Sequence, residues 1–140
     1  MRALGLWQPH SSLVRLGIKT IETRFWGTVH RGPILICSTK KVDPEWETIL
    51  RNIRGFGHNV PRSLIEDVGT MQCIVDLVDS RLGTNDDVWS ACAPLFVERD
   101  GQLVQKHALV LENLRQVRAR PVKCGRRWFD VADELIEVIP

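Results

Sequence analysis

The chain has 140 residues, of which 44% are hydrophobic and 26% are charged, and its formal net charge is +2. These values are typical of one soluble globular domain spanning residues 1–140, and the length is too short for two ordinary domains. No segment approaches the roughly 18 continuous apolar residues of a membrane span, and the first residues lack the apolar stretch of a secretory signal. We therefore expect a cytoplasmic protein without a membrane partner.

The cysteines and histidines form no metal-binding pattern. Cys37, Cys73, Cys92 and Cys124 are widely separated, without the close spacing of a zinc or redox motif, and the four histidines are equally scattered. We predict no metal site and no cofactor. Cys37 and Cys73 lie in apolar runs, where a free thiol behaves as a small buried hydrophobic group.

The first half of the chain predicts short strands and helices in alternation. The predicted strands of this half cover residues 2–7, 20–24 and 32–38. Pro9 suits the first turn of a short helix, and Gly17 suits the position just past its end. The third strand is a continuous apolar run, which is typical of a central strand. Asp43 followed by Pro44 indicates the start of a helix that extends to about residue 52.

The second half is richer in strands. Its predicted strands cover residues 71–79, 95–97, 103–104, 107–112 and 114–122, and its short helices cover residues 61–68 and 132–138. Asp100 and Gly101 give a strong hairpin signal, residues 55–59 read as a flexible loop, and residues 83–87 read as a polar turn. Many short strands with few helices predict an α+β protein built around a small barrel or a highly curved sheet.

Residues 17–24, with the sequence Gly-Ile-Lys-Thr-Ile-Glu-Thr-Arg, are the most informative stretch, and Trp7 and Trp26 flank them. A lysine, an acid and an arginine beside aromatic faces can neutralise a phosphate, stack on a base and read a base edge. This combination predicts a site for a ligand of nucleotide size. His10 and His30 bracket the stretch and are further candidates for ligand contact.

The spacing within this stretch sets a geometric condition. In a regular strand Lys19 and Glu22 face opposite sides, because their separation is odd. For both to enter one cleft, the chain must still be turning at Lys19, and Gly17 permits such a turn. Arg24 shares a face with Glu22 and Thr20 if the strand is regular from there.

Packing and solvation offer a competing interpretation. On an exposed strand end, the ion pairs of this stretch contribute little to stability, and tryptophans are chiefly large core side chains. We expect Trp46 and Trp89 to serve packing alone. We expect Lys19 and Arg24 to be exposed cleft charges whose removal changes stability little.

A second cationic segment lies near the C-terminus and contains no acid. Its members are Arg115, Arg118, Arg120, Lys123, Arg126 and Arg127. Such a run is either a solvated strand face or part of a nucleic-acid surface. The second interpretation is favoured by further cations in the first half of the chain, which are Arg24, Arg31, Lys40 and Lys41.

The pattern Gly-x-Lys-x-x-Glu-x-Arg, preceded by Trp-Gln-Pro-x-x-x-Leu and followed by Trp-x-Thr-x-x-Arg-Gly-Pro, resembles the signature of the ASCH (activating signal cointegrator homology) domain. Weaker matches occur at residues 40–41, 74–79 and 111–114 and at Trp128. The resemblance implies an α+β, PUA-like fold, which is a small β-barrel with short flanking helices, associated with RNA binding. The candidate nucleotide-binding residues are Trp7, Gln8, Pro9, Lys19, Thr20, Glu22, Arg24, Trp26, Arg31, Lys40 and Asn113.

Three functions are compatible with these residues. The first is a binding module in which cations contact the phosphates of RNA while an aromatic ring stacks on a base. The second is implied by the resemblance: some small ASCH proteins are amidohydrolases of N4-acetylcytidine, in which a lysine acts as base, a threonine three residues later as nucleophile and a distant glutamate as proton donor. Lys19 matches that base, but Glu22 occupies the position of the nucleophile. The third is a weak ribonuclease that uses Lys19 and Glu22.

We predict a binding module for RNA or another single-stranded nucleic acid. A hydrolase acting on a modified nucleoside, with Lys19 and Glu22 as its catalytic residues, is the alternative. The residue pattern does not specify the base, the choice between RNA and DNA, or the oligomeric state.

Overall fold

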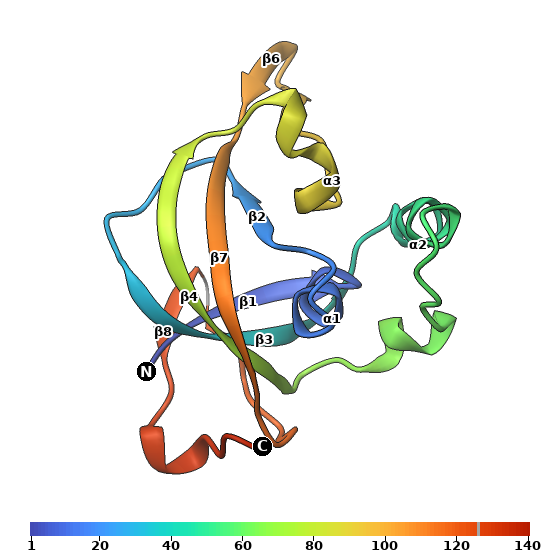
Figure 1. The fold of residues 1–140 in the computed structure, drawn as a ribbon. Helices are drawn as coiled ribbons and strands as arrows, with labels where there is room; N and C mark the ends of the chain where they lie inside the picture. Colours follow the sequence, from blue (N-terminus) through green and yellow to red (C-terminus); the bar gives the residue numbers. More distant parts are fainter. Residues whose placement is uncertain (126) are drawn as a thin grey trace.

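The computed structural model describes residues 1–125 and 127–140, and a strongly curved sheet of six strands dominates it (Figure 1). The strand order is β2-β7-β4-β3-β1-β8. Its strands are β1 (Arg2–Gln8), β2 (Ile21–Arg24), β3 (Gly32–Val42), β4 (Met71–Leu82), β7 (His107–Gln116) and β8 (Trp128–Asp130). Strands β1 and β3 are parallel, whereas all other neighbours are antiparallel.

Short helices and a separate hairpin surround the sheet (Figure 1). The hairpin joins β5 (Phe96–Arg99) to β6 (Gln102–Gln105). The helices are α1 (His10–Arg15), α2 (Trp46–Gly55) and α3 (Val88–Ala91), and the 3₁₀ turns are η1 (Arg62–Glu66), η2 (Asn85–Asp87) and η3 (Asp133–Leu135). None of the helices in the described residues is long and apolar enough to cross a membrane.

Strand β3 is the central strand that its apolar run predicts. Ile34 and Ile36 pack into the core inside the curve of the sheet, together with residues of β1, β4 and β7. Leu35 and Cys37 point to the opposite face, where the C-terminal segment covers them. Both faces of the strand are therefore buried, which explains why its sequence does not alternate with polar residues.

Two turns predicted from the sequence are confirmed, and both contain residues with positive φ values. Gly17 follows α1 with a φ of 76°, as expected for a residue just past a helix end. Asp100 and Gly101 both have positive φ values and connect β5 to β6, as the hairpin signal predicts.

Other elements differ from the sequence prediction. Residues 107–116 form one strand rather than two, because the pairing with β4 resumes at Arg115 after an irregularity at Asn113, whose φ is 55°. The helix predicted over 132–138 is only the short turn η3, while α3 and β8 were not predicted. The three residues of β8 are too few to give a periodic signal.

The predicted barrel is wrong because the sheet does not close, whereas the alternative of a highly curved sheet is confirmed (Figure 1). Within residues 1–125 and 127–140, β2 pairs only with β7 and β8 pairs only with residues 2–4 of β1, so the rest of β1 has β3 as its single neighbour. A side chain bridges the open seam instead: Nη2 of Arg24 on β2 donates a hydrogen bond to the carbonyl oxygen of Gly5 on β1, at 3.1 Å. The gap between β1 and β2 is thus held by a side chain rather than by a ladder of backbone hydrogen bonds.

Gly83, which follows β4, provides a test of the packing around Leu95. A Cβ atom at this position would lie 2.8 Å from Cγ of the buried Leu95 and 3.1 Å from the carbonyl oxygen of Lys106. We expect Gly83→Ala to lower the free energy of unfolding by about 1–3 kcal/mol through overpacking, measured by urea denaturation. Gly55→Ala is the control, because a Cβ there meets nothing within 4 Å. Equal stability of the two variants would contradict the packing.

Candidate functional site

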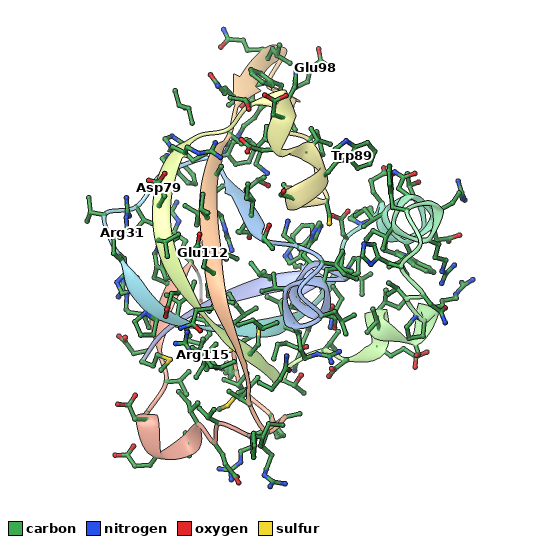
Figure 2. All side chains as sticks on the ribbon, in the orientation of Figure 1. Arg31, Asp79, Trp89, Glu98, Glu112 and Arg115 are labelled. Carbon is green, nitrogen blue, oxygen red and sulfur yellow. The ribbon has the colours of Figure 1, made fainter. Side chains whose placement is uncertain are left out.

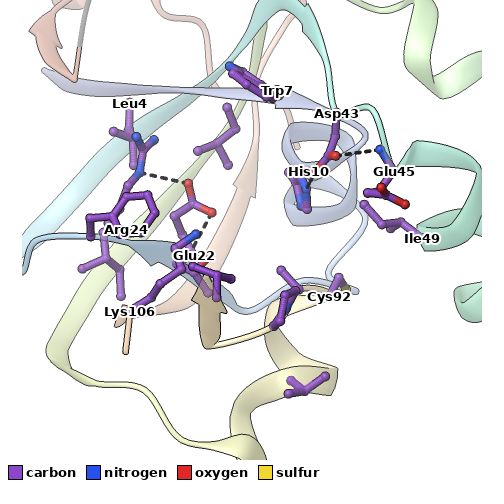
Figure 3. Close-up of a pocket in the computed structure, with 18 of the residues that line it drawn as sticks. Leu4, Trp7, His10, Glu22, Arg24, Asp43, Glu45, Ile49, Cys92 and Lys106 are labelled. Carbon is purple, nitrogen blue, oxygen red and sulfur yellow. Dashed lines mark hydrogen bonds and ion pairs between the residues drawn. The ribbon is translucent and has the colours of Figure 1, made fainter. Parts of the chain in front are cut away.

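A pocket of about 1260 Å³ opens along the seam between β1 and β2 and extends toward α2 and α3 (Figure 3). Its polar lining includes Glu22, Arg24, His10, Asp43 and Lys106. Its aromatic lining consists of Trp7, Phe25, Trp26, Phe56, Trp89 and Trp128. The volume exceeds the roughly 300–1,000 Å³ of common small-molecule sites, so the pocket has room for more than one planar ring.

A buried ion cluster of Lys19, Glu22 and Arg24 forms the innermost polar part of this region. Oε2 of Glu22 lies 3.1 Å from Nε of Arg24, and Oε1 lies 3.6 Å from Nζ of Lys19 and accepts a hydrogen bond from the backbone N–H of Thr23. Lys19 also donates to the carbonyl oxygen of Ala91. Strand β2 begins only at Ile21, so the chain is still turning at Lys19, as the odd spacing requires.

The cluster changes the pKa values of its members. Burial raises the pKa of Glu22, but the nearby charges of Arg24 and Lys19 outweigh this effect, so the pKa lies below its ordinary value. Burial lowers the pKa of Lys19, and the attraction of Glu22 opposes this only in part. Glu22 is therefore an ionised carboxylate at neutral pH, which accepts hydrogen bonds and donates none.

Lys19 does not lie in the cleft as an exposed charge, and that expectation is wrong. The residue is 1% exposed and is not part of the pocket lining, whereas Glu22 and Arg24 are. The side chain of Arg24 is about one third exposed. The pocket thus presents one carboxylate and one guanidinium, while the ammonium supports the carboxylate from beneath.

Exposed aromatic side chains form the rim of the pocket. Trp7 is 44% exposed, Trp26 is 59% exposed and Trp89 is 64% exposed, although each lines the pocket. The expectation that Trp89 serves packing alone is therefore wrong, since its ring stands at the surface (Figure 2) and meets Phe56 edge to face with centroids 4.3 Å apart. Such rings can stack on a planar ligand.

Lys106 and Asp43 line the pocket without a functional signal in the sequence, whereas His10 is a predicted candidate for ligand contact. Lys106 follows the β5–β6 hairpin, and burial lowers its pKa. Nε2 of His10 lies 2.7 Å from Oδ2 of Asp43, and this hydrogen bond lowers the pKa of Asp43 (Figure 3). From the sequence, Asp43 is predicted only to start a helix. In the described part of the chain, no three His, Cys, Asp or Glu side chains gather closely enough to hold a metal ion.

Four of the predicted binding residues line the pocket, and they are Trp7, Glu22, Arg24 and Trp26. Two others are buried structural residues: Gln8 donates hydrogen bonds to Oγ of Ser12 and to the carbonyl oxygen of Asp67, and Pro9 precedes α1. Thr20 is exposed outside the pocket.

The remaining predicted residues lie on other surfaces. Arg31 lies 3.9 Å from Asp79 (Figure 2), and Asn113 donates a hydrogen bond to Asp76. Lys40 is exposed near the end of β3 and does not line the pocket.

The C-terminal cationic segment is largely neutralised by acids. Arg115 pairs with Asp76 at 2.9 Å, and both Arg118 and Arg120 pair with Glu137. These contacts favour the interpretation of a solvated surface. Arg126 lies outside the described residues. Arg127 behaves differently from the paired arginines, because it lines the pocket and contacts the ring of Trp26.

Burial of the ion cluster has a measurable consequence. Lys19→Ala removes one partner of a buried ion pair and leaves a void, so we expect the free energy of unfolding to fall by about 3–5 kcal/mol. Lys19→Met keeps most of the volume and should cost less. Lys40→Ala is the matched surface control and should stay within about 0.5 kcal/mol of the natural chain. If Lys19→Ala is as stable as this control in urea denaturation, Lys19 is not buried in solution.

Comparison with known proteins agrees with the signature. No curated protein matches the sequence significantly. Among solved structures, a mutant ZmASCH protein from Zymomonas mobilis is similar in fold, with a TM-score of 0.56 and 14% sequence identity, and the match covers 95% of this chain and 91% of that one. The family model of the ASCH domain matches residues 4–122. The chain therefore belongs to the ASCH domain family.

Proposed function

We propose that this chain binds single-stranded nucleic acid, RNA in the first place, and takes one unpaired base into the pocket. The observation that carries this proposal is the Glu22–Arg24 pair, which lies at the inner end of a pocket rimmed by exposed indole rings. The ASCH family resembles PUA domains in fold, and these are associated with RNA binding. A base within a duplex cannot enter such a pocket, so the ligand must be unpaired.

The polar pair restricts which bases fit. The carboxylate of Glu22 is ionised, so it accepts hydrogen bonds from amino or ring N–H groups of a base. The guanidinium of Arg24 donates to a ring nitrogen or carbonyl oxygen beside that group. Cytosine, adenine and guanine offer an exocyclic amine to the carboxylate, whereas uracil offers only a ring N–H. We therefore expect a preference for the amine-bearing bases.

Stacking on the rim supplies affinity with little base preference. Trp7 belongs to β1, Trp26 follows β2, and Trp89 belongs to α3, so the rings come from different walls of the pocket. Stacking of a base on an aromatic side chain contributes about 1–3 kcal/mol. The combination of a polar inner pair and an aromatic rim resembles the way in which single-stranded RNA is commonly recognised.

The binding test uses fluorescein-labelled hexamers of cytidine, adenosine and uridine and follows anisotropy. We expect the cytidine or adenosine hexamer to bind more tightly than the uridine hexamer. Trp26→Ala should weaken binding by about 5-fold to 150-fold, because it removes one stacking ring from an exposed position. Arg24→Lys keeps a charge beside Glu22 but removes the planar donor set, and it should weaken binding and reduce the base preference.

The matched control for these variants is Arg118→Ala. Arg118 is exposed, pairs with Glu137 and lies outside the pocket lining, so its removal should leave binding unchanged. Absence of binding by the natural chain to all three hexamers would refute the proposed function. Equal losses in Arg118→Ala and Arg24→Lys would refute the role of the pocket.

Hydrolysis of a modified nucleoside is the second candidate, and one observation favours it. Thr23, which carries a hydroxyl group, is among the residues that line the pocket, although it is not at the sequence position that the family resemblance implies. The lowered pKa of Glu22 makes this carboxylate a weak general base at neutral pH, and Lys19 is buried beneath it. We therefore place hydrolysis second to binding.

The hydrolase candidate is tested with N4-acetylcytidine as substrate and chromatographic detection of cytidine. We expect turnover no faster than in buffer, because the pocket has no strong base beside the Thr23 hydroxyl. Thr23→Val is the matched variant, since it removes only the hydroxyl group. Rapid turnover by the natural chain that is lost in Thr23→Val would replace the binding module with a hydrolase.

A further inference from the structure

Many cations of the described residues have one of two kinds of partner. The first group pairs with carboxylates within 4.0 Å and comprises Lys19, Arg24, Arg31, Arg81, Arg115, Arg118 and Arg120. The second group contacts aromatic rings and comprises Arg2, Lys41, Arg62, Arg99, Lys106 and Arg127. Within residues 1–125 and 127–140, the side chains of this second group have no carboxylate within 4.0 Å and donate no hydrogen bond.

Except for Trp46, which contacts Arg62, the rings that hold these cations line the pocket. The guanidinium carbon of Arg99 lies 4.2 Å from the centroid of Phe25, and that of Arg127 lies 4.6 Å from the centroid of Trp26. At the β1 end of the pocket, Nζ of Lys41 lies 5.5 Å from the centroid of Trp7. Apart from Arg62, the ring-bound cations that lack acid partners in the described residues therefore lie beside the pocket.

A cation that lies over an aromatic ring keeps its donors available. The ring contact uses the face of the guanidinium and leaves its N–H groups, which lie in the plane, free to bind phosphate oxygens. The ring also restricts the motion of a long side chain, so less conformational freedom is lost on binding. Arg99 and Lys41 are thus held against rings and keep N–H donors that can bind phosphate.

The acids nearest to Arg99 in sequence do not neutralise it. Glu98 and Asp100 flank it in the β5–β6 hairpin, but in the described residues neither carboxylate lies within 4.0 Å of its guanidinium. Glu98 lies at the outer end of this hairpin (Figure 2). Successive strand residues point to opposite faces, which separates Arg99 from its neighbours.

We propose that a single strand of nucleic acid crosses the pocket mouth, with phosphates at Arg99 on the β2 side and at Lys41 on the β1 side of the inserted base. This path rests on the proposed function, because it assumes that a base occupies the pocket. The exposed faces of Trp26 and Trp7 lie beside these cations and stack on the neighbouring bases. The ligand is then at least three nucleotides long, and a free nucleoside uses only the pocket.

The experiment compares two ligand lengths in variants of equal charge. The probes are fluorescein-labelled cytidine hexamers, measured by anisotropy between 50 and 200 mM salt, and free cytidine, measured by tryptophan fluorescence. Arg99→Ala combined with Lys41→Ala removes two cations of the proposed path. Arg118→Ala combined with Arg120→Ala removes two cations outside the pocket and is the matched control. Arg24→Lys tests the base site itself.

Loss of two phosphate contacts should make the slope of log affinity against log salt concentration less steep by about 1.4 for the hexamer. The affinity for the hexamer should fall by about 25-fold at 0.1 M salt. Cytidine binding should change less than 2-fold, because neither Arg99 nor Lys41 lines the pocket. The control pair should leave the slope and the affinity for both probes unchanged. A deoxycytidine hexamer, measured in parallel, shows by its relative affinity whether RNA or DNA is the preferred strand.

The outcomes separate the two proposals. If the Arg99 and Lys41 double variant binds the hexamer as the control pair does, the strand path is wrong, while a loss in Arg24→Lys still supports the base site. If the double variant loses affinity equally for cytidine and for the hexamer, the two cations act on the base site and the path is also wrong. If the natural chain binds neither probe, the proposed function and the path both fail.

Discussion

The ion pairs of the buried Glu22 carboxylate hold the walls of the pocket together. The carboxylate pairs with Lys19 and Arg24, and each of these cations also reaches a backbone carbonyl of another element. Lys19 donates to Ala91 of α3, and Arg24 donates to Gly5 of β1. A buried charge is tolerated only when it is paired, so these contacts hold two walls of the pocket in fixed positions relative to β2.

The open seam of the sheet explains why the pocket exists. A closed barrel would pair β1 with β2 and fill the space between them with backbone hydrogen bonds. Here β2 is a four-residue edge strand, and the second half of β1 has one partner, so side chains occupy the seam. The cavity along this seam has a polar inner end formed by Glu22 and Arg24, while aromatic rings cover its rim.

For attraction to nucleic acid, the distribution of charged side chains over the surface matters more than the net charge. A net charge of +2 predicts no strong attraction to nucleic acid by itself. Carboxylates neutralise much of the cationic surface away from the pocket, as Glu137 does for Arg118 and Arg120. The cations that contact pocket aromatics, such as Arg99 and Arg127, lack such partners within the described residues. Among the described residues, Arg99 and Arg127 thus place positive charge without acid partners beside the pocket rings.

The family, the turn at Gly17, the central position of residues 34–37 and the convergence of Lys19, Glu22 and Arg24 could be predicted from the amino-acid sequence. These features follow from local backbone geometry and from patterns within one segment. The burial of Lys19 and the presence of Trp89, Lys106 and Arg127 in the pocket lining are seen only in the folded chain. Those contacts join residues far apart in the chain, and they depend on the curvature and incomplete closure of the sheet, which no local pattern specifies.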